Sequence, residues 1–308
     1  MADPPLVARR VTRRHASGRG VFEADLTVTA GDLVSLLGPN GSGKTTLTRS
    51  LATADPIDDG SISWFGRRDR RDPAVRRSLG VALDGAAHFE ELTGYQNAWF
   101  FARRMGLDAD RARRRLGDLV SWAELGDAVH RPVREYSLGM RQRLALIEAM
   151  VHEPRLVVLD EPTLALDWGG TLALVRRLEA LRAGGGAVVL ATNDVHLVER
   201  LGGRVAFLYE GRILHDGPVA SLLAGVGGMQ RMELDLRAPI AVERLLEAPG
   251  VRGGGREGSG VHLLLAPDAN PVRVLAALDG DSGLVAGMRV DRPHLGDAFI
   301  ELTGATLG

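Results

Sequence analysis

The segment that most constrains the fold of this chain is the run Gly38-Pro39-Asn40-Gly41-Ser42-Gly43-Lys44-Thr45. It fits G-x-x-x-x-G-K-[ST], follows the apolar run 33–37 and precedes TTLTRSLA, which predicts a helix. Strand, glycine-rich loop and helix in this order form a phosphate-binding loop. Its backbone N–H groups surround phosphate oxygens, and the start of the helix adds a favourable partial charge. The segment therefore predicts an α/β fold with a phosphate site.

Lys44 is the single lysine among the 38 basic residues of the chain. Arginine bias accounts for the other basic residues, but a planar guanidinium does not replace a compact ammonium between phosphates. We expect Lys44 to reach the terminal phosphates and the Thr45 hydroxyl to hold Mg²⁺.

A second motif is the apolar run 156–159 followed by Asp160 and Glu161. A charged strand end before the Pro162 turn gives the same pattern, but the upstream phosphate loop favours a catalytic role. Asp160 would bind Mg²⁺ through water, and Glu161 would act as general base toward the attacking water. A third motif, YSLGMRQR at 136–143, places Ser137 and Gly139 at a predicted helix start. Such a start is either an anion site or an ordinary helix cap.

The remaining pattern predicts two parts. Apolar strands at 156–160, 187–192 and 204–210 alternate with helices, which indicates a largely parallel α/β sheet. Residues 94–150 have helical periodicity. Glycines after residue 217 suggest a boundary, and a smaller α+β pattern follows.

Composition excludes several classes of protein. The chain has 308 residues, with 38 basic against 39 acidic side chains, which argues against a nucleic-acid partner. It has no cysteine, which excludes a disulfide scaffold, a thiolate zinc site and a cysteine nucleophile. The sequence shows no export signal and no apolar run of the roughly 18–20 residues that a membrane span requires.

The motif order GPNGSGKTT, YSLGMRQRL, LVVLDEPT and Leu166-Asp167 resembles the nucleotide-binding subunit of an ABC transporter. YSLGM stands where the family has LSGGQ, and residues 292–304 resemble the tail of the daunorubicin-resistance type. The resemblance implies a P-loop NTPase domain of the ABC type over 1–217, with a helical subdomain at about 88–150. A linker over 218–229 and a small accessory α+β domain over 230–308 would follow.

The resemblance also implies the ligands and the assembly. ATP, with Mg²⁺, would lie between the phosphate loop of one subunit, including Thr46, and the signature of a second. Ser137, Gly139 and Met140 would then contact the partner's ATP. Asp167 would lie at the interface of a homodimer, or of a heterodimer with a different nucleotide-binding subunit. His15 falls where the family often stacks an aromatic ring on adenine, and a surface histidine is the alternative.

Membrane partners follow from the same resemblance. Transmembrane permease subunits would dock near Leu83–Phe101, and one or two residues of the cluster Trp99-Phe100-Phe101 would contact them. The chain would then be cytoplasmic and peripheral on the inner face of the membrane.

Two positions depart from the family pattern. Asp84 is the best match to a glutamine that binds Mg²⁺ and water, and Asn193 stands where a histidine is expected. Asn193 can bond the γ-phosphate but cannot transfer a proton near neutral pH. We therefore expect normal ATP binding with slow or partner-controlled hydrolysis.

Two other functions fit the same motifs. One is a soluble regulatory or self-resistance ATPase that closes on ATP without transport. The other is a nucleotide sensor without turnover, which a Glu161→Gln substitution would leave unchanged.

Overall fold

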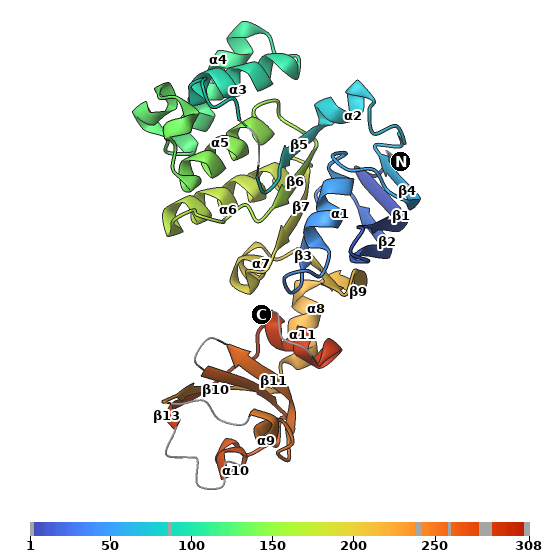
Figure 1. The fold of residues 1–308 in the computed structure, drawn as a ribbon, viewed down its shortest axis with the longest axis vertical. Helices are drawn as coiled ribbons and strands as arrows, with labels where there is room; N and C mark the ends of the chain where they lie inside the picture. Colours follow the sequence, from blue (N-terminus) through green and yellow to red (C-terminus); the bar gives the residue numbers. More distant parts are fainter. Residues whose placement is uncertain (1–2, 86–87, 238–241, 258–259, 277–284, 305–308) are drawn as a thin grey trace. The chain divides into compact units, whose positions relative to one another are not determined.

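The computed structural model describes residues 3–85, 88–237, 242–257, 260–276 and 285–304 (Figure 1). The chain forms two compact units. The first comprises Met1–Asn193 and Gly203–Asp216, and the second comprises Asp194–Gly202 and Gly217–Gly308.

A six-stranded sheet in the order β5-β6-β7-β3-β8-β9 forms the centre of the first unit (Figure 1). Its strands are β3 (Leu33–Leu37), β5 (Leu79–Ala82), β6 (Leu156–Asp160), β7 (Ala187–Thr192), β8 (Arg204–Tyr209) and β9 (Arg212–Pro218). The five strands from β5 to β8 pair in parallel. Every residue of β3, β6 and β7 is buried, as their continuous apolar sequences predict. The parallel order brings the C-terminal ends of these three strands to one edge.

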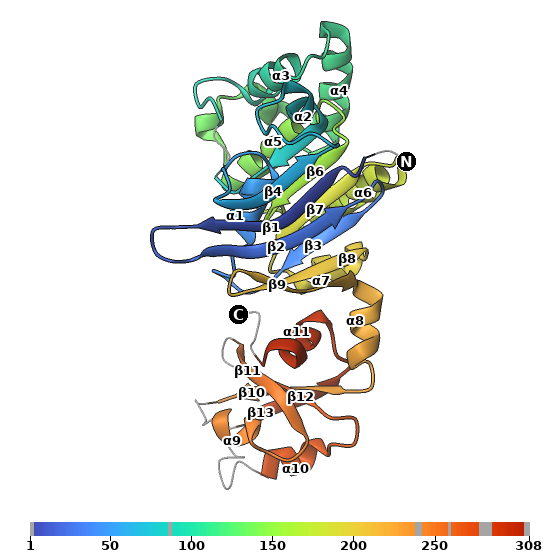
Figure 2. The ribbon, with the colours of Figure 1, turned by 90° about the vertical axis from the view of Figure 1, so that its right-hand side faces the viewer.

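A three-stranded antiparallel sheet in the order β2-β1-β4 completes the core of this unit. Its strands are β1 (Leu6–Arg14), β2 (Gly20–Val28) and β4 (Asp59–Trp64), which lie in front of the central sheet in Figure 2. Helix α1 (Lys44–Leu51) packs against strands of both sheets through its buried face. The helix that begins at the phosphate loop is therefore held on two sides.

The helical region predicted at about 88–150 contains α3 (Gly94–Arg104), α4 (Ala109–Trp122) and α5 (Leu138–Met150), with two short 3₁₀ turns between α4 and α5. Thr93 begins α3 with a reciprocal capping box, and Asp108 caps α4. The first unit also contains α2 (Pro73–Ser78) and α6 (Trp168–Ala183).

The second unit is built on an antiparallel sheet in the order β11-β12-β10-β13. Its strands are β10 (Gln230–Leu236), β11 (Val251–Glu257), β12 (Gly260–Leu265) and β13 (Val285–Asp291). Its helices are α7 (Val195–Leu201), α8 (Val219–Val226), α9 (Val242–Leu246), α10 (Pro271–Ala276) and α11 (Leu295–Thr303). The buried Arg231 guanidinium lies 2.9 Å from Asp297 on α11. This pair ties the tail segment 292–304 to the sheet.

Three features differ from the sequence expectation. Helix α8 occupies most of 218–229, where a linker was expected. Helix α7 groups with the second unit although it lies within 1–217. Strand β11, with the sequence VRGGGRE, had no predicted counterpart. Among the described residues, no helix has both the length and the apolar character needed to cross a bilayer.

Candidate nucleotide site

The loop between β3 and α1 requires its glycines. A Cβ at Gly38 would lie 2.0 Å from the carbonyl oxygen of Leu208, so only hydrogen fits there. Gly43 has φ +106°, a left-handed conformation that glycine adopts without a steric penalty. The glycines at these positions therefore allow the loop backbone to pack closely against neighbouring backbone atoms.

The start of α1 is open to an anion. Thr93, Asp108, Ser137 and Asp167 cap the helices α3 to α6 with their side chains. The residue before helix α1 is instead Gly43, and no side chain among the described residues caps this helix. Its first N–H groups and its dipole therefore face the loop without a side-chain acceptor, as a phosphate site requires.

Lys44 lies folded into the loop that precedes it. Its Nζ donates to the carbonyl oxygens of Gly38 at 2.6 Å and Pro39 at 3.3 Å, and the residue is only 6% exposed. Burial lowers the pKa of Lys44, while the charges of Glu161 and Asp160 oppose that shift. The ammonium thus bonds to the loop carbonyls and is also attracted by the charges of the two carboxylates.

Asp160 ends β6 with a carboxylate suited to a cation. The residue is 1% exposed, and within the described part of the chain neither carboxylate oxygen has a hydrogen-bond partner. Burial raises the pKa of Asp160, the nearby Thr45 hydroxyl lowers it, and the charge of Asp84 raises it. A buried carboxylate without a partner is costly unless a ligand completes it. Thr45 and Asp160, together with phosphate oxygens and water, therefore fit the donor set of Mg²⁺.

Glu161 follows with a backbone φ of +44°, which is unusual for a residue that is not glycine. Its N–H donates to the carbonyl oxygen of Ala191 at 2.8 Å, and its Oε2 accepts a 3.0 Å hydrogen bond from the Thr192 hydroxyl. Burial raises the pKa of Glu161, which the bond from Thr192, the charge of Lys44 and the N–H of Asn193 oppose. A carboxylate so placed can accept a proton.

The remaining predicted residues of this cluster surround the loop. The Nε2 of His15 lies 2.9 Å from the Thr46 hydroxyl, which places the exposed His15 ring beside the start of α1. Asn193 is exposed directly after β7, and Asp84 is exposed two residues after β5. The structure thus brings His15, Asp84 and Asn193 to the same edge as the phosphate loop. Their roles toward ATP stay predictions.

The signature residues form a second cluster in the same unit. Ser137, Gly139, Met140 and Asp167 line one cavity of about 470 Å³. Ser137 accepts a bond from the N–H of Met140, so the helix cap expected as one alternative is present. None of the described loop residues 38–46 lines this cavity. One chain therefore holds the two clusters separately.

Sequence reasoning missed two residues of these clusters. Arg143 lies 3.1 Å from Asp167, the residue that caps α6, and joins the signature helix to it. Thr192 had no assigned role, because the last residue of a buried strand carries no distinctive signal. Its bond to Glu161 depends on the parallel pairing of β6 with β7.

Comparisons with known proteins identify the family and the fold of the chain. The family model described as ABC transporter matches residues 21–164. A solved ATP-binding subunit of an ABC transporter is 26% identical, has a TM-score of 0.67, and aligns over 72% of this chain and 93% of that one.

Relatives extend the match over nearly the full chain. The daunorubicin resistance ATP-binding protein DrrA3 of Streptomyces coeruleorubidus is 34% identical over 99% of this chain and 97% of its own length. The Nod factor export ATP-binding protein I of Burkholderia pseudomallei strain 1710b is 33% identical over 99% of this chain and 98% of its own. With its phosphate loop, its paired carboxylates and this full-length similarity, the chain belongs to the family of ATP-binding proteins of ABC transporters.

Proposed function

We propose that this chain binds ATP with Mg²⁺ at the phosphate loop and hydrolyses it to drive export through separate membrane subunits. The observation that carries the proposal is the buried Asp160 carboxylate beside Lys44 and Thr45, for which the described residues supply no hydrogen-bond donor other than the nearby Thr45 hydroxyl. This arrangement is incomplete without a cation and phosphates.

In this proposal each side chain has one task. Lys44 exchanges its loop carbonyls for the terminal phosphates, and the open first turn of α1 donates to them. Glu161 takes the proton of the attacking water as general base. Thr45 and Asp160 would hold Mg²⁺, which would supply neutralisation of phosphate charge. Asn193 bonds the γ-phosphate through its amide, and Asp84 adds a negative charge near Asp160.

A second nucleotide-binding subunit would complete the site. The separation of the two clusters supports this, because none of the described loop residues 38–46 lines the signature cavity of the same chain. Large apolar side chains flank the signature cluster with high exposure: Leu138 is 62% exposed, Leu164 53% and Trp168 66%. We propose that two copies pair with two-fold symmetry, which places each loop against the other's Ser137–Met140 turn. A different nucleotide-binding subunit could take the place of the second copy.

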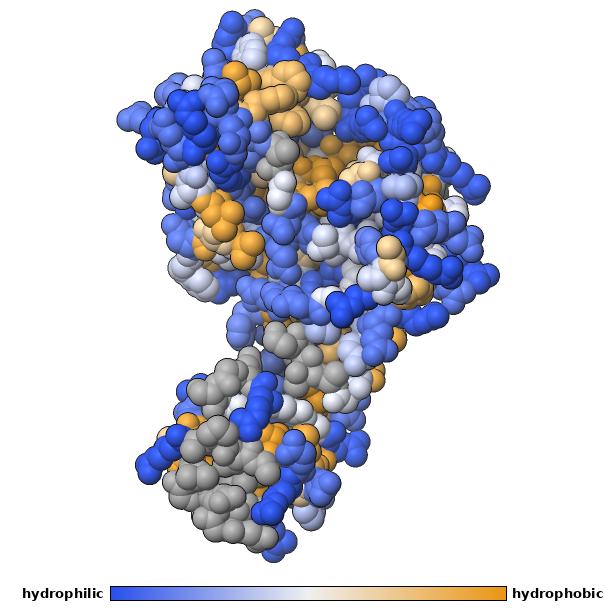
Figure 3. Space-filling view, in the orientation of Figure 1, coloured by the Kyte–Doolittle hydropathy of each residue, from blue (hydrophilic) through white to orange (hydrophobic). Residues whose placement is uncertain are grey.

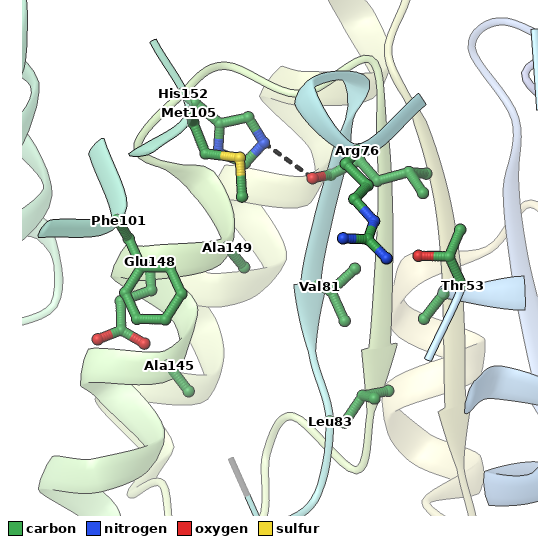
Figure 4. A pocket seen from close by; sticks show the side chains of 12 residues that line it. Thr53, Arg76, Val81, Leu83, Phe101, Met105, Ala145, Glu148, Ala149 and His152 are labelled. Atoms are coloured by element: carbon green, nitrogen blue, oxygen red, sulfur yellow. Dashed lines mark hydrogen bonds between the residues drawn. The ribbon is translucent and has the colours of Figure 1, made fainter. Parts of the chain in front are cut away.

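A groove in the first unit supports a membrane partner. Figure 3 shows hydrophobic surface gathered over α3 and around β5. A pocket of about 350 Å³ lies there, with Val81 and Leu83 on one side and Phe101, Met105 and Glu148 on the other (Figure 4). We propose that a cytoplasmic helix of the permease inserts into this pocket. Of the cluster Trp99-Phe100-Phe101, Phe101 is the member that lines it.

The transported molecule is an export substrate in this proposal. The relatives carry names for daunorubicin resistance and for Nod factor export. Similarity over nearly the full chain to both kinds of exporter supports export, with the substrate chosen by the membrane subunits.

The test is a Glu161→Gln variant of the full chain. The variant should lose turnover and accumulate an ATP-bound dimer, which size-exclusion chromatography with light scattering detects at roughly twice the mass of the free chain. Turnover equal to that of the unaltered chain would contradict the ATPase mechanism. An ATP-bound monomer would contradict the paired assembly.

A further inference from the structure

We propose that Thr192 is a positioning residue for hydrolysis, which holds the Glu161 carboxylate in place through its hydroxyl. The inference rests on the proposed function of Glu161 as general base, and it adds a residue that neither the sequence motifs nor the comparisons assign.

Separate backbone contacts fix the position of the donor residue, Thr192, and of the acceptor residue, Glu161. Thr192 is the last residue of β7, is 0% exposed and pairs with Leu37 of β3. Glu161 follows β6, and its N–H is bonded to Ala191. Parallel pairing of β6 with β7 therefore sets the two backbones, and the Thr192 hydroxyl spans the remaining 3.0 Å to the carboxylate. A β-branched side chain in a packed strand has few rotamers, so the donor is already oriented.

Glu161 needs such a contact because a competing one is near. The charge of Lys44 attracts the Glu161 carboxylate. If Glu161 turned toward Lys44, its carboxylate would no longer contact the attacking water. The Lys44 ammonium would then pair with the carboxylate and not with the phosphates. The Thr192 hydroxyl opposes this by holding Oε2 on the side of β7. The left-handed backbone conformation of Glu161 also supports a holding contact. Such strain persists only where the surrounding contacts hold the residue in place.

The neighbouring position makes the contact more important in this chain. Residue 193 is asparagine where the family pattern has histidine, so no imidazole follows Thr192 to share the orientation of the base. Within the described residues, the Thr192 hydroxyl is the side-chain group that donates to Glu161. Thr192, at the end of β7, is therefore the residue that orients the Glu161 carboxylate.

The experiment compares Thr192→Val with Thr192→Ser in the purified full chain. Valine keeps the shape and removes the hydroxyl, whereas serine keeps the hydroxyl. We expect Thr192→Val to lower kcat about tenfold, equal to about 1.4 kcal/mol. The Kd of ATP should stay within about twofold, because the loop contacts are unchanged. Thr192→Ser should restore most of kcat. Native kcat in Thr192→Val would overturn the inference.

A double-mutant cycle separates positioning from a structural role. In a Glu161→Gln background the added Thr192→Val change should cost nothing further, because the base is already absent. The same tenfold loss in both backgrounds would overturn the inference. If Glu161→Gln alone leaves kcat unchanged, the proposed function of Glu161 fails instead. Should Thr192→Val melt at a much lower temperature, Thr192→Ala against Thr192→Ser makes the same comparison, because both lack the γ-methyl group and only serine keeps the hydroxyl donor.

Discussion

The Nζ of Lys44 donates a 2.6 Å hydrogen bond to the carbonyl oxygen of Gly38, six residues earlier in the same loop. Lys44 is only 6% exposed, so the surrounding residues leave little room for a larger cation. A guanidinium is broader and planar, so Lys44→Arg should keep the charge but not the fit. We expect turnover to fall by at least about 100-fold, the scale for losing one preorganised donor, with weaker ATP binding.

Lys44 also supplies a chemical check on this prediction. As the single lysine, it is the one side-chain amine in the sequence, so amine-directed labelling followed by peptide mapping reports on it alone. ATP should slow its labelling in the unaltered chain. Labelling at an equal rate with and without ATP, or full turnover in Lys44→Arg, would contradict the placement of the ammonium against phosphates.

The site follows largely from local sequence, whereas other parts depend on long-range pairing. Asp160 and Glu161 are predictable because apolar runs define the parallel strands and polar residues follow their C-terminal ends. The Arg143–Asp167 and Thr192–Glu161 contacts cannot be predicted from the sequence, because each joins segments that only the tertiary fold brings together. Strand β11 escaped prediction because its Gly253-Gly254-Gly255 core has no strand preference of its own.

If the pocket in Figure 4 is the docking site of the permease, substitutions of two neighbouring phenylalanines should have different effects. Phe101 lines the pocket, whereas Phe100 is 45% exposed and packs edge-on against Phe89 and Phe101. Phe101→Ala should weaken stimulation of turnover by the permease several-fold, because an interface anchor is lost. Basal turnover without the permease should be unchanged.

Phe100→Ala is the matched control, since it removes the same side chain one position away. It should leave stimulation intact. Equal loss in both variants would indicate a general effect on α3, and full stimulation in Phe101→Ala would exclude this pocket as the docking site. ATPase assays with reconstituted permease measure both.

A third prediction concerns stability, because Glu148 is a buried carboxyl group. It is 9% exposed, with Nδ1 of the buried His88 3.3 Å from one oxygen. Burial raises the pKa of Glu148, and His88 opposes this only in part. Because the folded-state pKa is raised, the contribution of the protonated Glu148 to stability is fully present below about pH 4.3, the pKa of an unperturbed glutamate. That contribution is lost as pH rises through the folded-state pKa.

Glu148→Gln should therefore melt above the unaltered chain at neutral pH, and the difference should vanish toward pH 4. About 1 kcal/mol would shift the midpoint by roughly 2–4 °C in a unit of this size. Glu153→Gln is the opposite control, since hydrogen bonding to Arg111 lowers the pKa of that exposed carboxyl group. It should melt lower at neutral pH. Calorimetry across this pH range decides the sign, and a difference for Glu148→Gln that does not depend on pH would contradict the prediction.

The last prediction concerns Asn193, which follows β7 beside Glu161. An amide can bond the γ-phosphate but cannot carry a proton near neutral pH, as an imidazole can. If this limits hydrolysis, Asn193→His should raise kcat by roughly 100-fold or more, the range for one general acid–base group. Asn193→Gln is the control, because it enlarges the side chain without adding a titratable group, and it should not raise kcat.

The second altered position decides how far the gain extends. Asp84 adds a negative charge near Asp160, and a second carboxylate beside a Mg²⁺ site strengthens binding of the cation. Asp84→Gln should therefore raise the Mg²⁺ concentration needed for half-maximal turnover, and at saturating Mg²⁺ the double variant should keep the gain in kcat from Asn193→His. Steady-state assays across Mg²⁺ concentrations measure both effects. No gain in kcat from Asn193→His, alone or with Asp84→Gln, would mean that another step, such as dimer closure or release of products, limits turnover.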